Sequence, residues 1–144
     1  LQSQYGGGPF DVGVWKVSPT GKFLAVTYYG GSASDAIQGC ATDAQGNVYF
    51  SATTQSSNIS LTVPGGTGGG EDVVAVKLSS DLTRVMYAQR FGGRGADVAR
   101  ASWLGAQNQF VVVGQTDSPN FPLLNAPFAN PGGSLDGFLV RLVP

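Results

Sequence analysis

The chain has 144 residues, of which 8 are basic, 9 are acidic and none is histidine. This length supports one ordinary domain with a hydrophobic core, and the near-neutral balance gives no electrostatic support for a nucleic-acid or anionic-membrane partner. Without histidine the chain lacks the Ser-His-Asp and Cys-His triads and the usual zinc and haem ligands, and we expect no cofactor.

The composition favours β-structure. Glycine occurs 22 times, glutamate once, and β-branched and aromatic residues are common, which predicts an all-β chain with tight turns. No apolar run reaches the ~18 residues of a membrane span. The opening LQSQYGGGPF lacks Met, a basic region and an apolar core. We therefore expect no signal peptide here, and residue 1 to be an internal or processed position of a longer product.

Nine strands are predicted in chain order, separated by glycine-rich or polar turn signals. They span residues 11–16, 22–29, 36–43, 47–53, 72–77, 84–91, 98–105, 109–115 and 136–141. The segments 47–53 and 109–115 are apolar nearly throughout, as in the run FVVV. A strand without polar alternation is usually covered on both faces, so stacked sheets are expected.

The chain repeats itself. Gly30-Gly31 returns as Gly92-Gly93, 62 positions later, and Asp35 returns as Asp97. In the same register NVYFSATT overlays QFVVVGQT, and SSNISL overlays SPNFPL. A D-x-x-x-x-[KR] segment occurs three times, as DVGVWK, DVVAVK and DGFLVR. Four-stranded units that repeat in this way are typical of the blades of a β-propeller.

These motifs resemble the bacterial SBBP family of β-propeller repeats. The matching segments are YYGGSASDAIQGCATDAQGNVYFSATTQSSN with DVVAVKLSSDLT in the first unit, and VVVGQTDSPNFP in the second. The resemblance covers about residues 10 to 143. The second unit departs from it at SWLGAQNQ, and the first has Ile59-Ser60 where the family usually shows Phe-Pro. It implies a partial propeller of four-stranded antiparallel blades and an extracellular, cell-surface or periplasmic location.

The repeat divides the chain into four segments. Residues 1–9 are an N-terminal extension, 10–22 the last strand of a preceding blade, 23–82 blade one and 83–144 blade two. Closed propellers need about four to eight blades, so two and a quarter blades cannot close a ring. The expected partners are further blades, from the same gene product or from other subunits.

The carboxylates have more than one interpretation. Asp35 and Asp97 follow the Gly-Gly pairs, and an Asp in such a turn commonly caps backbone N–H groups. Calcium binding is the alternative, although no D-x-D-x-D-G spacing is present.

Three further aspartates open the D-x-x-x-x-[KR] strands. Because five positions separate each one from its basic residue, the two side chains point to opposite faces and cannot pair locally. We expect them to guard the edge of an outermost strand. The aspartates and the basic residues five positions on are Asp11 and Lys16, Asp72 and Lys77, and Asp136 and Arg141.

Several single residues are assigned to packing. Cys40 has no cysteine partner and no basic neighbour, so a small buried side chain is expected. Trp15 and Trp103 are expected in the core or between blades, with a ligand platform as the alternative. At least one of Tyr28 and Tyr29 is expected to pack inward.

Long connections at 54–71 and 116–135 are expected at the same end as the Gly-Gly loops. Loops of this length are often functional. If the protein binds a ligand or partner through loops, this face is the candidate, although NFPLLNAPF can instead cover the blade rim. The candidate residues are Asp35, Asn58, Asp97, Asn120, Phe121 and Phe128.

Three functional hypotheses remain from the sequence. The leading one is a non-enzymatic structural or protein-interaction module, part of a larger extracytoplasmic β-propeller. The second is a carbohydrate-binding propeller completed by oligomerisation. The third is an enzyme domain whose active residues lie in other blades. The segment itself offers no nucleophile–base pair, no P-loop and no expected metal site.

Overall fold

The computed structural model describes residues 1–65, 69–123, 126 and 132–144. The described residues are all-β apart from one 3-10 turn, η1 (Ala106–Asn108). The strands are β1 (Val12–Val17), β2 (Phe23–Tyr29), β3 (Asp35–Thr42), β4 (Val48–Thr54), β5 (Asp72–Leu78), β6 (Val85–Phe91), β7 (Asp97–Leu104), β8 (Phe110–Thr116) and β9 (Asp136–Leu142).

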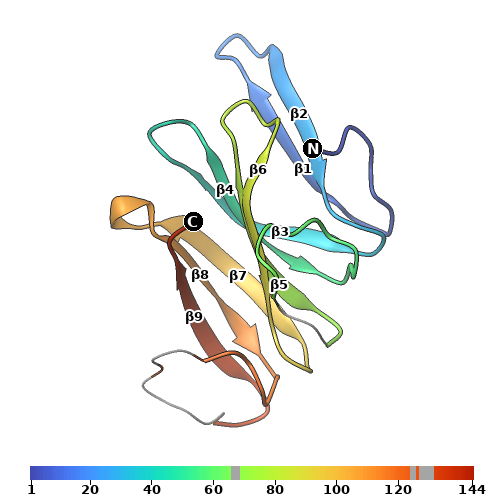
Figure 1. Ribbon diagram of the computed structural model, residues 1–144, viewed down its shortest axis with the longest axis vertical. Coiled ribbons are helices and arrows are strands. Elements are labelled where there is room, and N and C mark those ends of the chain that lie inside the picture. The colour runs from blue at the N-terminus through green and yellow to red at the C-terminus, as the bar shows by residue number, and fades with distance from the viewer. Residues whose placement is uncertain (66–68, 124–125, 127–131) are drawn as a thin grey trace.

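The strands form three antiparallel sheets in which sequence neighbours pair. The first sheet is β1-β2, the middle sheet is β3-β4-β5-β6, and the third sheet is β7-β8-β9. Figure 1 shows them following one another along the long axis of the molecule, with β1 and β2 at the top and β8 and β9 at the bottom. The expected all-β class is confirmed.

All nine predicted strands are present, and each end lies within one residue of its predicted position. Their grouping into sheets differs from the expected grouping. The strands of segment 23–82 do not form one sheet, because β2 pairs with β1 and β6 pairs with β5. The sheet boundary therefore falls one strand later than the repeat boundary.

Turn chemistry explains this displacement. The turn before β2 is closed by Ser18 N–H donating to the Lys22 carbonyl, and the turn before β6 by Ser79 N–H donating to the Arg84 carbonyl. Each of these backbone hydrogen bonds closes a hairpin between the strands on either side. The Gly-Gly loops, residues 30–34 and 92–96, instead carry the chain from one sheet to the next.

Each sheet–sheet interface holds its own hydrophobic cluster. Between the first and middle sheets the Tyr29 ring meets Phe50 edge-on, with centroids 5.5 Å apart. Between the middle and third sheets Tyr49 lies 5.6 Å from Phe110. The middle sheet is thus covered on both faces, and β4 is buried at every position except Val48, as its apolar sequence predicted.

Two expectations were wrong. Cys40 is exposed, because it lies on β3, an edge strand of the middle sheet. The Asp72 strand is not outermost, since β5 lies between β4 and β6 and Asp72 is fully buried. Trp15 and Trp103 are about half exposed, on the faces of the outer sheets that no other described sheet covers, so their place between blades stays a prediction.

The β5–β6 turn makes a pH-dependent prediction. Asp81 Oδ1 accepts from Ser79 Oγ at 2.6 Å and from Thr83 Oγ1 at 2.8 Å, and these bonds lower the pKa of Asp81 from 3.8 to about 2. A lowered carboxyl pKa contributes stability above the ordinary pKa that is lost as pH falls through the lowered value. We expect Asp81→Ala to lower the unfolding temperature at pH 7, with the difference from wild type shrinking between pH 4 and pH 2. Thermal melts across this range measure it, and a constant difference would contradict the assignment.

Candidate functional site

The Gly-Gly loop between β2 and β3 is held by the buried side chain of Asp35. Its Oδ2 accepts from Gly31 N–H at 2.8 Å and from Ser56 Oγ at 2.7 Å. Asp35 is 1% exposed. The capping role expected from the sequence is confirmed, and the partner hydroxyl comes from the long loop after β4.

The same network recurs between β6 and β7. Asp97 Oδ2 accepts from Gly93 N–H at 2.6 Å and from Ser118 Oγ at 2.8 Å. Sequence reasoning missed both serines. The signal that could have found them is Ser-x-Asn, which returns 62 positions later as Ser56-Asn58 and Ser118-Asn120.

Asn58 and Asn120 tie the long loops to the Gly-Gly loops. Asn58 Oδ1 accepts from Ser32 N–H, and Asn120 Oδ1 accepts from Arg94 N–H, both at 2.9 Å. The two kinds of loop therefore share one end of the sheets, as predicted. The side-chain oxygens of the two asparagines are already engaged within the chain.

Phe121 packs against the third sheet. Its ring stacks on Phe138 of β9, with centroids 4.8 Å apart and planes 22° from parallel. This contact agrees with the expectation that the segment covers the rim. Phe128 lies outside the described residues. The structure thus brings Asp35 together with Asn58, and Asp97 together with Asn120, in two separate and equivalent loop networks.

A second carboxylate, not singled out from the sequence as a site residue, lies beside each network. Asp72 is fully buried, and Gly92 lies between it and Asp97: a Cβ on Gly92 would overlap Asp72 Oδ1 and stand 2.8 Å from Asp97 Oδ2. Arg90 donates from Nε to Asp72 Oδ2 at 2.7 Å, and its Nη2 lies 2.5 Å from the same oxygen. The guanidinium also reaches the Ser56 carbonyl at 3.0 Å.

The electrostatics of this pair follow from burial and neighbouring charge. Burial raises the pKa of Asp72, the ion pair with Arg90 lowers it, and the charge of Asp97 raises it further. Two carboxylates that influence each other in this way lie close together. The positive charge of Arg90 offsets part of the free-energy cost of burying the two carboxylates.

The equivalent pair near the N-terminus is Asp11 and Asp35, with Gly30 between them. A Cβ on Gly30 would overlap Asp11 Oδ1 and stand 2.9 Å from Asp35 Oδ2. Asp11 Oδ2 accepts from Gly6 N–H. The other oxygens, Asp11 Oδ1 and Asp35 Oδ1, are buried and have no hydrogen-bond partner in the described part of the chain.

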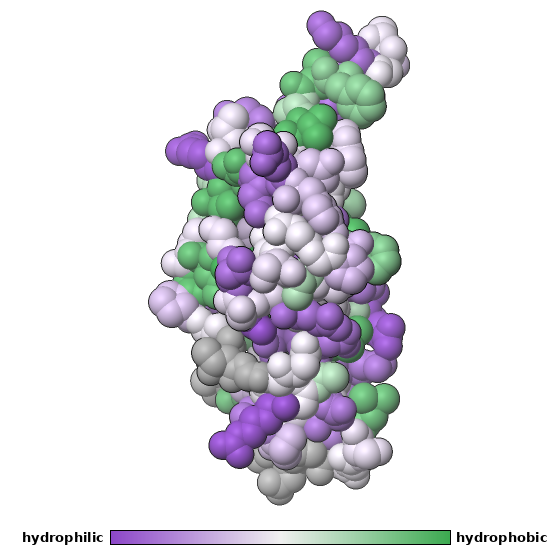
Figure 2. Space-filling model, turned by 90° about the vertical axis from the view of Figure 1, so that its right-hand side faces the viewer, coloured by the Kyte–Doolittle hydropathy of each residue, from purple (hydrophilic) through white to green (hydrophobic). Residues whose placement is uncertain are grey.

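The two outer sheets expose apolar side chains on the faces turned away from the middle sheet. Trp15 of β1 is 53% exposed and Leu139 of β9 is 65% exposed. Leu24 and Val26 are exposed on the same face as Trp15, whereas the exposed Val17 and Phe23 lie at the end of the hairpin, where Val17 lines a cleft beside the middle sheet. Figure 2 shows apolar side chains near the top of the molecule, where β1 and β2 lie, and further apolar patches lower down, separated by polar ones.

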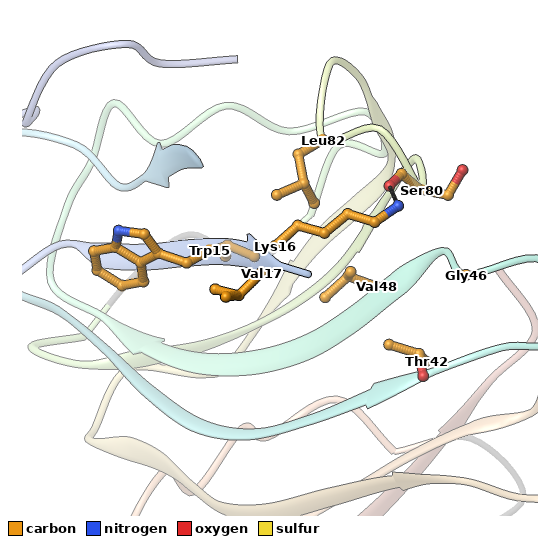
Figure 3. A pocket seen from close by; sticks show the side chains of 9 residues that line it. Trp15, Lys16, Val17, Thr42, Gly46, Val48, Ser80 and Leu82 are labelled. Atoms are coloured by element: carbon orange, nitrogen blue, oxygen red, sulfur yellow. Dashed lines mark hydrogen bonds between the residues drawn. The ribbon is translucent and has the colours of Figure 1, made fainter. Parts of the chain in front are cut away.

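A shallow cleft of about 320 Å³ opens where the first sheet meets the turns of the middle sheet. Figure 3 shows Lys16 reaching across it to the Ser80 carbonyl, at 3.0 Å, while Trp15 extends the other way. Val14, Val17, Val48 and Leu82 supply most of the remaining lining, which is largely apolar. The cleft therefore offers packing surface and no acid–base pair.

The described residues contain no cluster of three or more His, Cys, Asp or Glu side chains able to hold a metal ion. Within the same residues no helix has the length and apolar character needed to cross a membrane.

The chain matches no known family model, and a search of curated proteins finds no relative. The likeness to SBBP repeats thus stays a prediction from the sequence motifs. The hydrogen-bond networks of the two Gly-Gly loops repeat at the same spacing as the sequence.

Proposed function

We propose that this chain is a non-enzymatic structural or protein-interaction module that forms part of a larger extracytoplasmic β-propeller. The observation that carries the proposal is the pair of open, partly apolar faces on the two outer sheets. Large exposed apolar patches commonly mark protein interaction sites. The partners we propose are further antiparallel sheets of the same repeat, supplied by other blades or other subunits.

Equivalent positions of the middle and third sheets support this partner class. Ala75 of β5 is fully buried under the third sheet. Its counterpart in the D-x-x-x-x-[KR] repeat is Leu139 of β9, which is 65% exposed. Another sheet packed on the third sheet in the same way would cover Leu139. The packing of the third sheet on Ala75 therefore serves as a model for the packing of a further sheet on Leu139.

The strand edges support it as well. Among the described strands, β5 is paired on both sides, by β4 and β6, whereas β9 is paired with β8 alone. An unpaired edge next to an exposed apolar face invites a further strand. A strand equivalent to β6 would complete the third sheet to four strands.

The structure offers less support for a carbohydrate-binding propeller. Sugar recognition needs free polar groups beside aromatic surfaces, and the Oδ1 atoms of Asn58 and Asn120 are used within the loops. Asp35 and Asp97 are buried. The exposed rings of Trp15 and Trp103 lie on the open sheet faces, where packing against another sheet accounts for them.

The mass of the native chain in solution tests the proposal. We expect light scattering after size-exclusion chromatography to give a multiple of 14.8 kDa at micromolar concentration. Leu139→Glu places a charge on the open face and is expected to shift the mass toward the monomer. Met86→Glu is the matched control, since Met86 is 46% exposed but belongs to the middle sheet. A stable wild-type monomer, or equal effects of the two substitutions, would contradict the proposal.

A further inference from the structure

A lysine on one sheet reaches a backbone carbonyl of the next sheet at both sheet–sheet boundaries. Lys16 of β1 donates from Nζ to the Ser80 carbonyl at 3.0 Å, the contact drawn in Figure 3. Lys77 of β5 donates from Nζ to the Pro144 carbonyl at 3.3 Å. Ser80 follows the end of β5 by two residues, and Pro144 follows the end of β9 by two residues. The same contact is therefore built twice, between equivalent positions of successive sheets.

Arg141 is the third basic residue of this series. It closes the D-x-x-x-x-[KR] segment of β9, as Lys16 does in β1 and Lys77 does in β5. Side chains alternate along a strand, so Arg141 shares the open face of the third sheet with Leu139. Arg141 is exposed there, because no further sheet of the described residues lies beyond that face.

The first sheet leaves the opposite kind of face open. Trp15 pairs with Val26 across β1 and β2, and both side chains are about half exposed. Their counterparts in the β5–β6 hairpin, Val76 and Ala88, pair in the same register. Both counterparts are buried in the cluster between the first and middle sheets. The first sheet thus exposes the face that the middle sheet uses to pack on the sheet before it.

We propose, on the basis of the function proposed above, that copies of this chain associate head to tail, with the third sheet of one copy packed on the first sheet of a second copy. The third sheet presents the face that the middle sheet turns toward its successor, and the first sheet presents the face that the middle sheet turns toward its predecessor. These two open faces are the two halves of a contact that the chain already makes at both internal boundaries. Such a contact is heterologous, so it leads to a ring or a filament.

The polar partner of Arg141 follows from the same register. Pro19 follows the end of β1 by two residues, as Ser80 follows the end of β5. It is exposed in the turn between β1 and β2. In the head-to-tail contact the guanidinium of Arg141 donates to the Pro19 carbonyl of the second copy. The first sheet has two described strands, fewer than the other sheets, so the contact is smaller than those inside the chain and association depends on concentration.

A complementation experiment tests the head-to-tail geometry. Leu139→Glu places a charge on the open face of the third sheet, and Trp15→Glu places one on the open face of the first. We expect each variant alone to give the mass of one chain, 14.8 kDa, in light scattering after size-exclusion chromatography. An equimolar mixture is expected to give the mass of two chains, because one intact face of each kind remains. Val26→Glu replaces Trp15→Glu if circular dichroism shows that the latter is unfolded.

Two substitutions of Arg141 test the polar contact. Arg141→Met removes the donor but keeps an apolar side chain, and it is expected to raise the concentration needed for association by roughly tenfold. Arg141→Lys is expected to associate like wild type, because lysine makes the equivalent contact at both internal boundaries. Arg84→Met is the matched control, at an exposed arginine in the turn between β5 and β6.

The outcomes separate this inference from the proposed function. A wild-type chain that stays monomeric at every concentration would contradict both. If Leu139→Glu is monomeric while Trp15→Glu still associates, or if the mixture of the two folded variants stays monomeric, the head-to-tail contact is overturned and the proposed function stands. Equal association of Arg141→Met and Arg84→Met would overturn the contact assigned to Arg141.

Discussion

Gly92→Ala is expected to destabilise the chain by roughly 2–4 kcal/mol. The new Cβ would overlap Asp72 Oδ1 and stand 2.8 Å from Asp97 Oδ2. Neither carboxylate can withdraw easily, because both residues are fully buried and Arg90 holds Asp72 through two nitrogens. The overlap therefore forces either the backbone or the ion pair to move.

Chemical denaturation of wild type and variant measures this effect. Gly133→Ala is the control, since a Cβ there meets no atom of the described residues within 4 Å. Gly30→Ala provides a graded comparison: its Cβ would overlap Asp11, which is partly exposed and has more room to turn aside. We expect the loss of stability to be largest for Gly92, smaller for Gly30 and near zero for Gly133. Equal values at Gly92 and Gly133 would contradict the crowded geometry.

Arg90→Gln is expected to cost roughly 3–5 kcal/mol at neutral pH, because it leaves the buried carboxylate of Asp72 without its counter-charge. Burial already raises the pKa of Asp72, and loss of Arg90 removes the main influence that lowers it. A carboxyl group with a raised pKa favours the folded state when protonated, and this contribution is lost as pH rises through the raised value. The deficit of the variant should therefore shrink as pH falls toward the ordinary pKa of aspartate.

A double variant separates charge from packing. Arg90→Gln with Asp72→Asn removes both charges, and we expect it to recover much of the stability lost in the single variant, since an unpaired buried charge costs more than the missing pair. Arg100→Gln is the control, at an exposed arginine whose Nε contacts Gln115 at 3.3 Å. A double variant as unstable as Arg90→Gln alone would show that the lost packing of the guanidinium causes the effect.

The strands were predictable because each is a short apolar or alternating segment between turn signals. The grouping of the strands into sheets was not predictable, because a sequence repeat does not indicate which of its strands is the first strand of a sheet. The hydrogen-bonded turn from Ser79 to Arg84 makes β5 and β6 a hairpin, whereas the loop after Gly92 leads to another sheet. Connection length could not decide the grouping, since residues 79–84 and 92–96 are of nearly equal length.

The site was predictable only in part. The capping role of Asp35 and Asp97 follows from residue type and position, and the structure bears it out. The approach of Asp72 to Asp97 was hidden, because 25 residues and a change of sheet separate them, and the spacing of one strand cannot show a contact between sheets. For the same reason the exposure of Trp15 could not be anticipated: it depends on which neighbouring sheet covers β1.

The one-strand displacement between repeat and sheet has a consequence for how such chains can change length during evolution. The first copy gives its first strand, β2, to the preceding sheet and receives β6, the first strand of the second copy, in its own sheet. An in-frame duplication or deletion of one copy adds or removes four strands, wherever the breakpoints fall within the period. The pairing of all other strands is preserved. Recombination can therefore alter the number of units without breaking a sheet, while neighbouring units stay interlocked through the strands they exchange.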